Sequence, residues 1–144
     1  MIKVLNLSKE FPKKDGTVFR AVDDISFEAH DSEIVCLLGV NGAGKTTTMR
    51  ILSTIFKPSG GTAEIQGFDI AKNAQQVREN LGFLTGDTGL YNRLRGYEFI
   101  RYFGRLYGVE EKTIDARIKE MADMLDMHDF LDKKIEFMST GMKQ

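Results

Sequence analysis

Polar and apolar residues alternate in the first thirty positions in a way that predicts an antiparallel pair of strands. We expect these strands over residues 2–7 and 19–28, and the hydrophilic run 12–16 between them is expected to be their turn. The pattern then changes at 34–38, which is an unbroken run of five apolar residues rich in branched side chains. Such a run predicts a strand buried on both faces.

The next forty residues predict short helices and strands in alternation. Apolar positions after residue 47 are compatible with a buried helix, and Ser59, Gly60 and Gly61 mark a turn. The predicted elements are a helix over 47–55, a short strand over 62–66, a surface helix over 70–80 and a second buried strand over 81–85.

Beyond Gly86 the periodicity becomes helical. The segment 96–107 places its apolar residues on one helical face and is followed by Gly108, which is typical of a helix end. The segment 111–127 repeats the pattern with several methionines. We interpret this methionine-rich stripe as core packing rather than as an adaptable binding surface. The second half is therefore predicted to be a small all-helical unit.

A glycine-rich loop separates the predicted strand at 34–38 from the predicted helix at 47–55. The loop reads Gly39, Val40, Asn41, Gly42, Ala43, Gly44, Lys45 and Thr46, which is a complete G-x-x-x-x-G-K-[ST] motif, and Thr47 follows it. Three glycines let the backbone wrap around a phosphate chain with its N–H groups pointing inward, and the helix N-terminus adds partial positive charge. A turn that merely joins a strand to a helix has no use for a Lys-Thr pair.

The motif assigns a role to each polar side chain of this loop. Lys45 supplies a full charge for the β and γ phosphates, the Thr46 hydroxyl is the usual Mg²⁺ ligand, and Thr47 can reach the α phosphate. The sequence therefore predicts a site for a nucleoside triphosphate and Mg²⁺.

Composition and charge narrow the possible partners. The 144 residues contain 20 Lys and Arg against 21 Asp and Glu, a formal net charge of -1, so nucleic acid is not an expected partner. The lone Cys36 is expected to be a small buried hydrophobe in the strand at 34–38. No signal-peptide core follows Met1, and no apolar run approaches the roughly 20 residues of a membrane helix. A soluble, cytoplasmic protein is expected.

Two motifs together resemble the ATP-binding cassette of ABC transporters. One is the phosphate loop, preceded by a strand-like segment at 22–27. The other, near the end, is Met138-Ser139-Thr140-Gly141-Met142-Lys143-Gln144, which is similar to the family's signature loop Leu-Ser-Gly-Gly-Gln. This variant looks like those of the subfamily that powers sodium extrusion and drug export. Phe11 matches the aromatic position on which the family stacks adenine, although a lone Phe beside a Pro is by itself more often turn packing.

The resemblance implies an α/β fold. It consists of a P-loop NTPase (RecA-like) core, an antiparallel β subdomain and a helical subdomain insert. Residues 1–92 would form the β subdomain and the first part of the core, and residues 93–144 the helical subdomain that ends in the signature loop.

The sequence departs from the family pattern at two places. Gly86 stands where the family carries the Gln that touches Mg²⁺, and the adjacent Asp87 either holds the ion through water or is merely solvated. The chain also ends at Gln144, before the Walker B carboxylates, and is expected to be the N-terminal part of a cassette; Glu136 and His128 are read as surface residues rather than substitutes. The runs 34–38 and 81–85 would then lack a neighbouring strand and expose their apolar faces.

The resemblance implies an ATP-binding subunit that couples ATP hydrolysis to transport, in the direction of export. Its partners would be transmembrane permease subunits at the inner face of the cell membrane. A second cassette would also bind, with the Ser139 hydroxyl and the Gly141 N–H reaching the γ phosphate held by the partner copy. This chain alone is expected to bind ATP without turnover. The alternatives are a soluble ABC-type ATPase without a membrane partner and an inert nucleotide-binding fragment.

Overall fold

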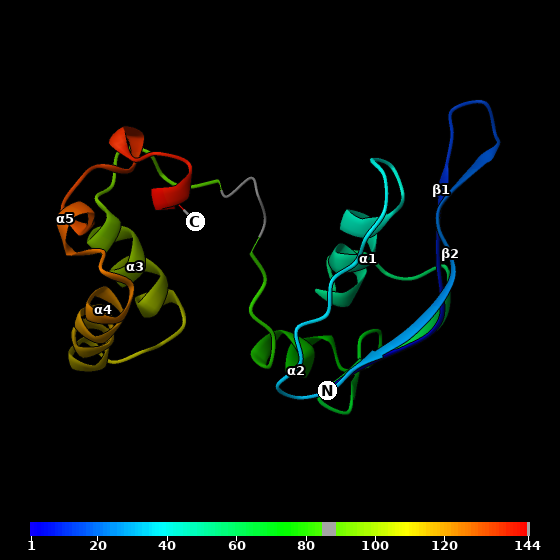
Figure 1. Cartoon of the computed structure of the whole chain (residues 1–144), viewed down its shortest axis with the longest axis horizontal. Helices are drawn as coiled ribbons and strands as arrows, with labels where there is room; N and C mark the ends of the chain where they lie inside the picture. Colours follow the sequence, from blue (N-terminus) through cyan, green and yellow to red (C-terminus); the bar gives the residue numbers. More distant parts are fainter. Residues whose placement is uncertain (85–88, 144) are drawn as a thin grey trace. The chain divides into compact units, whose positions relative to one another are not determined.

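The computed structural model describes residues 1–84 and 89–143, which form two compact units (Figure 1). The first unit is Met1–Phe83 and the second is Leu84–Gln144. The functional partition into 1–92 and 93–144 stays a prediction. Among the described residues, no helix is both long and apolar enough to cross a membrane.

The first unit is built on a four-stranded antiparallel sheet with the order β2-β1-β3-β4. The strands are β1 (Ile2–Pro12), β2 (Val18–Ala29), β3 (Gly60–Ile65) and β4 (Phe68–Asp69). The predicted hairpin of the first thirty residues is confirmed, because β1 pairs with β2 from Ile2 opposite Ala29 to Pro12 opposite Val18. The predicted short strand at 62–66 is confirmed as β3.

Two helices accompany this sheet: α1 (Lys45–Leu52) and α2 (Ala74–Glu79). The core joins Val4 and Leu7 of β1 to Ile51 of α1 and Val77 of α2, and each of these four side chains is at most 1% exposed. Because one face of each element is apolar, the helices bury the sheet's inner face and leave polar positions outside. The helix predicted over 70–80 is shorter than expected, because Asp69 ties down the backbone N–H groups of Ala71 and Lys72 in a turn.

The second unit is helical, as predicted. Its helices are α3 (Gly96–Leu106), α4 (Glu111–Leu125) and α5 (His128–Leu131), followed by the 3-10 turns η1 (Ile135–Phe137) and η2 (Gly141–Lys143). Arg101 on α3 bonds to Glu111 on α4 at 3.0 Å. A Cβ on Gly104 of α3 would lie 2.8 Å from the Ile114 side chain of α4, so a larger residue at this position would force Ile114 to shift.

The apolar run at 34–38 does not form the predicted strand. Ile34 is 96% exposed and Leu38 is 91% exposed, and Cys36 is exposed rather than buried. Residues 81–84 form no strand either, while Thr85, Gly86 and Asp87 lie outside the described residues. A strand needs neighbours to bond its N–H and C=O groups, and no described segment pairs with either run. The prediction of an unpaired run with exposed apolar side chains is thus confirmed for 34–38. It is only partly right for 81–84, because Leu81 packs against the core and Leu84 is exposed.

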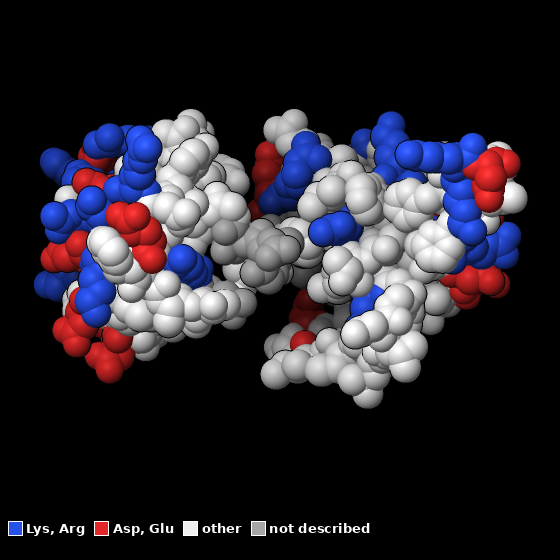
Figure 2. Space-filling view, turned by 90° about the horizontal axis from the view of Figure 1, so that it is seen from above, with Lys and Arg blue, Asp and Glu red and all other residues white. Residues whose placement is uncertain are grey.

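Acidic and basic side chains are interspersed over each unit on the face that Figure 2 draws. This mixture agrees with the near-zero net charge of the sequence. The expectation that nucleic acid is not a partner stays a prediction.

Candidate functional site

The glycine-rich loop ends where α1 begins, and its last glycine is the N-cap of that helix. Gly44 has φ 85° and its carbonyl accepts the Thr48 N–H at 2.8 Å, the first bond of the helix. The N–H groups of Lys45, Thr46 and Thr47 precede that bond and therefore have no acceptor within the helix. They point out of the positive end of the helix dipole, which is the arrangement that receives an anion.

Close packing against β2 holds the loop in place. A Cβ on Gly44 would lie 2.3 Å from the carbonyl oxygen of Ala21, so the loop backbone touches the strand backbone directly. At Gly42, with φ 87°, a Cβ would meet nothing within 4 Å, and this glycine is required by its backbone conformation alone. The two glycines are therefore required for different reasons: Gly44 by its close contact with Ala21, and Gly42 by its backbone conformation.

The Lys45 side chain folds back over its own loop. Its Nζ donates to the carbonyl oxygens of Gly39 at 2.5 Å and Val40 at 2.9 Å. Two neutral carbonyls are weaker partners for an ammonium than a phosphate oxygen, because hydrogen bonds between ionised groups are the stronger ones. The ammonium is thus kept beside the loop.

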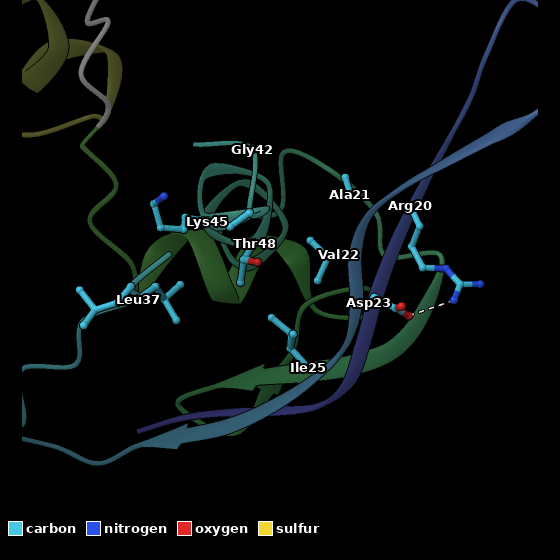
Figure 3. A pocket seen from close by; sticks show the side chains of 11 residues that line it. Arg20, Ala21, Val22, Asp23, Ile25, Leu37, Gly42, Lys45 and Thr48 are labelled. Atoms are coloured by element: carbon cyan, nitrogen blue, oxygen red, sulfur yellow. Dashed lines mark hydrogen bonds and ion pairs between the residues drawn. The ribbon is translucent and has the colours of Figure 1, made fainter. Parts of the chain in front are cut away.

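Two hollows open beside the loop, and β2 forms a wall of both. One, of about 290 Å³, is lined by Phe19 and Ala21 opposite residues 41–47. The other, of about 420 Å³, lies around Gly42, Lys45 and Thr48 opposite Val22 and Asp23 (Figure 3). Sequence reasoning missed these β2 residues. Strand alternation could not have identified them, because the register shifts between the pairs Lys9–Val22 and Glu10–Arg20 and leaves Ala21 as an extra residue on β2.

The residues present fit a magnesium triphosphate. Thr46 is exposed at the helix start, and the described residues contain no cluster of three His, Cys, Asp or Glu side chains that could hold a metal by themselves. Mg²⁺ usually takes one or two protein ligands together with phosphate oxygens and water, so a single hydroxyl suits it. The hollows contain one carboxylate, Asp23, whose Oδ1 lies 3.0 Å from a guanidinium nitrogen of Arg20 (Figure 3).

Phe11 is already engaged by neighbouring side chains. Its ring is half-buried and meets Phe56 edge to face, with the centroids 5.6 Å apart. The Lys9 ammonium lies 5.1 Å from the Phe11 centroid. Phe11 is not among the residues lining either hollow beside the loop.

The signature-like loop of the second unit is exposed and supported from behind. Ser139 and Gly141 are exposed, and the Ser139 hydroxyl accepts the Met142 N–H at 3.3 Å. The backbone just before them is anchored, because the Ile135 N–H donates to Leu94 at 2.9 Å and the Glu136 N–H donates to Asn92 at 3.1 Å. The loop is thereby presented outward on a fixed base.

The two residues interpreted as ordinary surface groups, His128 and Glu136, make exposed contacts with neighbouring side chains. His128 Nε2 lies 2.7 Å from Asp123, and Glu136 lies 3.8 Å from the Lys134 ammonium. Neither residue lines a hollow beside the phosphate loop.

Known proteins share both the sequence pattern and the fold. NatA, an ABC transporter ATP-binding protein of Bacillus subtilis, is 39% identical over all of this chain, which spans 58% of its length. Phospholipid-transporting ATPase ABCA3 of Mus musculus is 34% identical over 99% of this chain, which spans 8% of that protein. The chain thus spans little more than half of the length of NatA and less than a tenth of the length of ABCA3.

A solved structure and a family profile complete the comparison. A dimeric ATP-binding cassette in a post-hydrolysis state bound to ADP and Pi superposes with a TM-score of 0.83 at 20% identity, covering 99% of this chain and 65% of that one, and shares the fold. The fold is therefore that of a P-loop NTPase cassette, of which this chain covers a part. The profile of the family described as ABC transporter matches residues 22–144. The chain belongs to the ABC transporter family, in its ATP-binding cassette.

Proposed function

We propose that this chain is the nucleotide-holding part of an ATP-binding subunit, which couples ATP binding and hydrolysis to transport through membrane partners. The observation that carries the proposal is the phosphate loop. Its backbone is packed against Ala21, three helix N–H groups stand without intrahelical acceptors, and the Lys45 ammonium is held beside them.

Each group of the loop would bind a different part of the magnesium nucleotide. The N–H groups of residues 45–47 would hold phosphate oxygens, and Lys45 would exchange its two carbonyl acceptors for the β and γ phosphates. Thr46 would hold Mg²⁺, which neutralises charge on the phosphates, and Thr47 would contact the α phosphate. Lys45 is the residue of this chain that stabilises the charge of phosphoryl transfer.

We propose that the 144 residues alone bind ATP without turning it over. Hydrolysis needs a group that orients the attacking water. Among the described residues, the carboxylate that lines the hollows beside the loop is Asp23, and it is engaged by Arg20.

The exposed signature-like loop supports a second step of the proposal. In a pair of cassettes, the Ser139 hydroxyl and the Gly141 N–H of one copy would contact the γ phosphate held by the other. The exposure of both residues and the anchored backbone behind them support this role. Tyr91 is exposed, and it would belong to the surface offered to transmembrane subunits at the inner face of the cell membrane. Export is the proposed direction, on the similarity of the signature variant.

Titration calorimetry of the chain with Mg-ATP tests the proposal. We expect saturable binding, lowered roughly 10- to 150-fold in Lys45→Ala, because a charge-assisted hydrogen bond contributes about 1.5–3 kcal/mol. Bound nucleotide should also raise the free energy of unfolding, by about 2.7 kcal/mol at 100 times the dissociation constant. Equal affinity of both proteins would contradict the assignment of the loop.

A further inference from the structure

Strand β2 carries one extra residue where it passes the phosphate loop. Two consecutive residues of β1 pair with Arg20 and Val22, so Ala21 between them is an extra residue on β2. Such a β-bulge takes the extra residue out of the ladder and bends the strand. The Ala21 carbonyl is also the group that the loop backbone touches, since a Cβ on Gly44 would lie 2.3 Å from its oxygen. The bulge therefore supplies the contact that holds the loop.

The Arg20 guanidinium bridges the two sides of this bulge. Its Nη1 donates to Asp23 Oδ1 at 3.0 Å, beside the stretch of β2 that carries Ala21 (Figure 3). Its Nε and Nη2 both contact Glu10 Oε1, at 3.0 and 2.9 Å, and Glu10 is the direct partner of Arg20 on β1. All three guanidinium nitrogens are thus engaged by two carboxylates, one beyond the bulge and one across from it.

The bond between Arg20 and Asp23 depends on the bulge. Side chains three positions apart in a regular strand point to opposite faces, and their Cα atoms are about 10 Å apart. Here both side chains are exposed and bonded to each other, whereas Val22 between them is 5% exposed. The extra residue has therefore shifted the alternation of the strand by one position. The bond would be lost in a regular strand, so its free energy favours the bulge.

A second ion pair joins the same two strands away from the bulge. Lys3 and Glu28 are direct partners in the register, and their charged groups are 3.1 Å apart. The next pair along, Val4 with Phe27, continues in regular register. Neither charged residue lines a hollow beside the phosphate loop. This pair is therefore a matched control for a cross-strand ion pair that holds no bulge.

We propose that Glu10, Arg20 and Asp23 are positioning residues for the nucleotide site. By holding the bulge they fix the Ala21 carbonyl, and through it they fix the phosphate loop in the shape that receives the phosphates. The inference rests on the proposed function, since it takes a nucleoside triphosphate in that loop as given. None of the three side chains has to touch the nucleotide for this role.

Removal of a carboxylate separates positioning from direct charge. Asp23 lines the hollow beside Lys45, so on Coulomb's law alone Asp23→Ala should strengthen the binding of Mg-ATP. Positioning predicts the reverse sign. We expect Asp23→Ala and Arg20→Ala each to weaken binding about 3- to 10-fold in titration calorimetry, because one exposed ion pair is equivalent to up to about fivefold and here two share a guanidinium. Lys3→Ala should leave the dissociation constant unchanged.

A conservative variant and a measurement without nucleotide complete the test. Arg20→Lys retains the charge but not the planar fork, so it should weaken binding as Arg20→Ala does. In the labelled chain without nucleotide, the amide resonances of Ala21 and of residues 42–44 should shift in both Arg20 variants and in Asp23→Ala. They should not shift in Lys3→Ala. Circular dichroism would establish that each variant retains the fold.

The possible results distinguish this inference from the proposed function. Unchanged or tighter Mg-ATP binding by Asp23→Ala would overturn the inference and leave the proposed function standing. Full affinity in Arg20→Lys would attribute the effect to charge rather than to the fork and would also overturn the inference. Equal weakening in Lys3→Ala would do the same, because it would remove the link to the bulge. Absence of Mg-ATP binding by the unmodified chain would overturn both.

Discussion

Strand β1 and the segment 34–38 contain apolar residues of the same types, yet their environments are opposite. Val4 and Leu7 of β1 are at most 1% exposed, whereas Ile34 and Leu38 are more than 90% exposed. β1 has β2 on one side and β3 on the other, and no described strand lies beside 34–38. Burial of apolar side chains therefore follows from the availability of partners for the backbone, since unpaired N–H and C=O groups stay in water.

The phosphate loop is packed on one side only, so it combines features of the paired strand β1 and of the unpaired segment 34–38. The exposed segment precedes it, while β2 and α1 pack against it through Ala21, Gly44 and Thr48. Its shape is therefore held from the β2 and α1 side.

The largest effect is expected from truncating a buried side chain of the paired region. Leu7→Ala should lower the free energy of unfolding by about 2–5 kcal/mol, because it removes a fully buried side chain and leaves a cavity. Leu38→Ala is the matched control, and it should change that free energy by less than about 0.5 kcal/mol. Urea unfolding followed by circular dichroism measures both. Comparable losses in the two variants would mean that 34–38 is buried after all.

A smaller effect is expected where the loop touches β2. Gly44→Ala and Gly42→Ala both place a side chain at a left-handed φ, which costs roughly 1–2 kcal/mol. Only the first also drives a Cβ into the Ala21 carbonyl, so its melting temperature without nucleotide should be clearly the lower of the two. Differential scanning calorimetry gives the comparison. Equal melting temperatures would show that contact with β2 does not hold the loop.

The smallest effect concerns acid stability at the edge of the paired sheet. Hydrogen bonds from the N–H groups of Lys72 and Ala71 hold the pKa of Asp69 below its ordinary value, although partial burial opposes the shift. A lowered folded-state pKa contributes stability that is complete above the unfolded value, near 4, and is lost as the pH falls through the folded value. Asp69→Asn should therefore flatten the pH dependence of unfolding below about pH 4. If the pH dependence of the free energy of unfolding is the same in Asp69→Asn, Asp69 makes no such contribution.

Much of this molecule was predictable because its determinants are local. The glycine spacing before Lys45, the alternation in β1 and β2 and the helical periodicity after Gly96 each fix a structure within a few residues. The contact between Gly44 and Ala21 was not predictable, because it joins residues far apart in the chain through backbone atoms that carry no side-chain signal. For the same reason the sequence pointed to Phe11, while the packing of Phe56 and Lys9 around it became visible only in the fold.

The most direct test follows the backbone amides of the loop by nuclear magnetic resonance while Mg-ATP is added to the labelled chain. We predict amide shifts concentrated at residues 39–47 and at Phe19 and Ala21, with the amides of the β1–β2–β3 sheet already dispersed before nucleotide is added. Dispersion that appears across the whole chain only after Mg-ATP is added would contradict the claim that β2 and α1 hold the loop in advance.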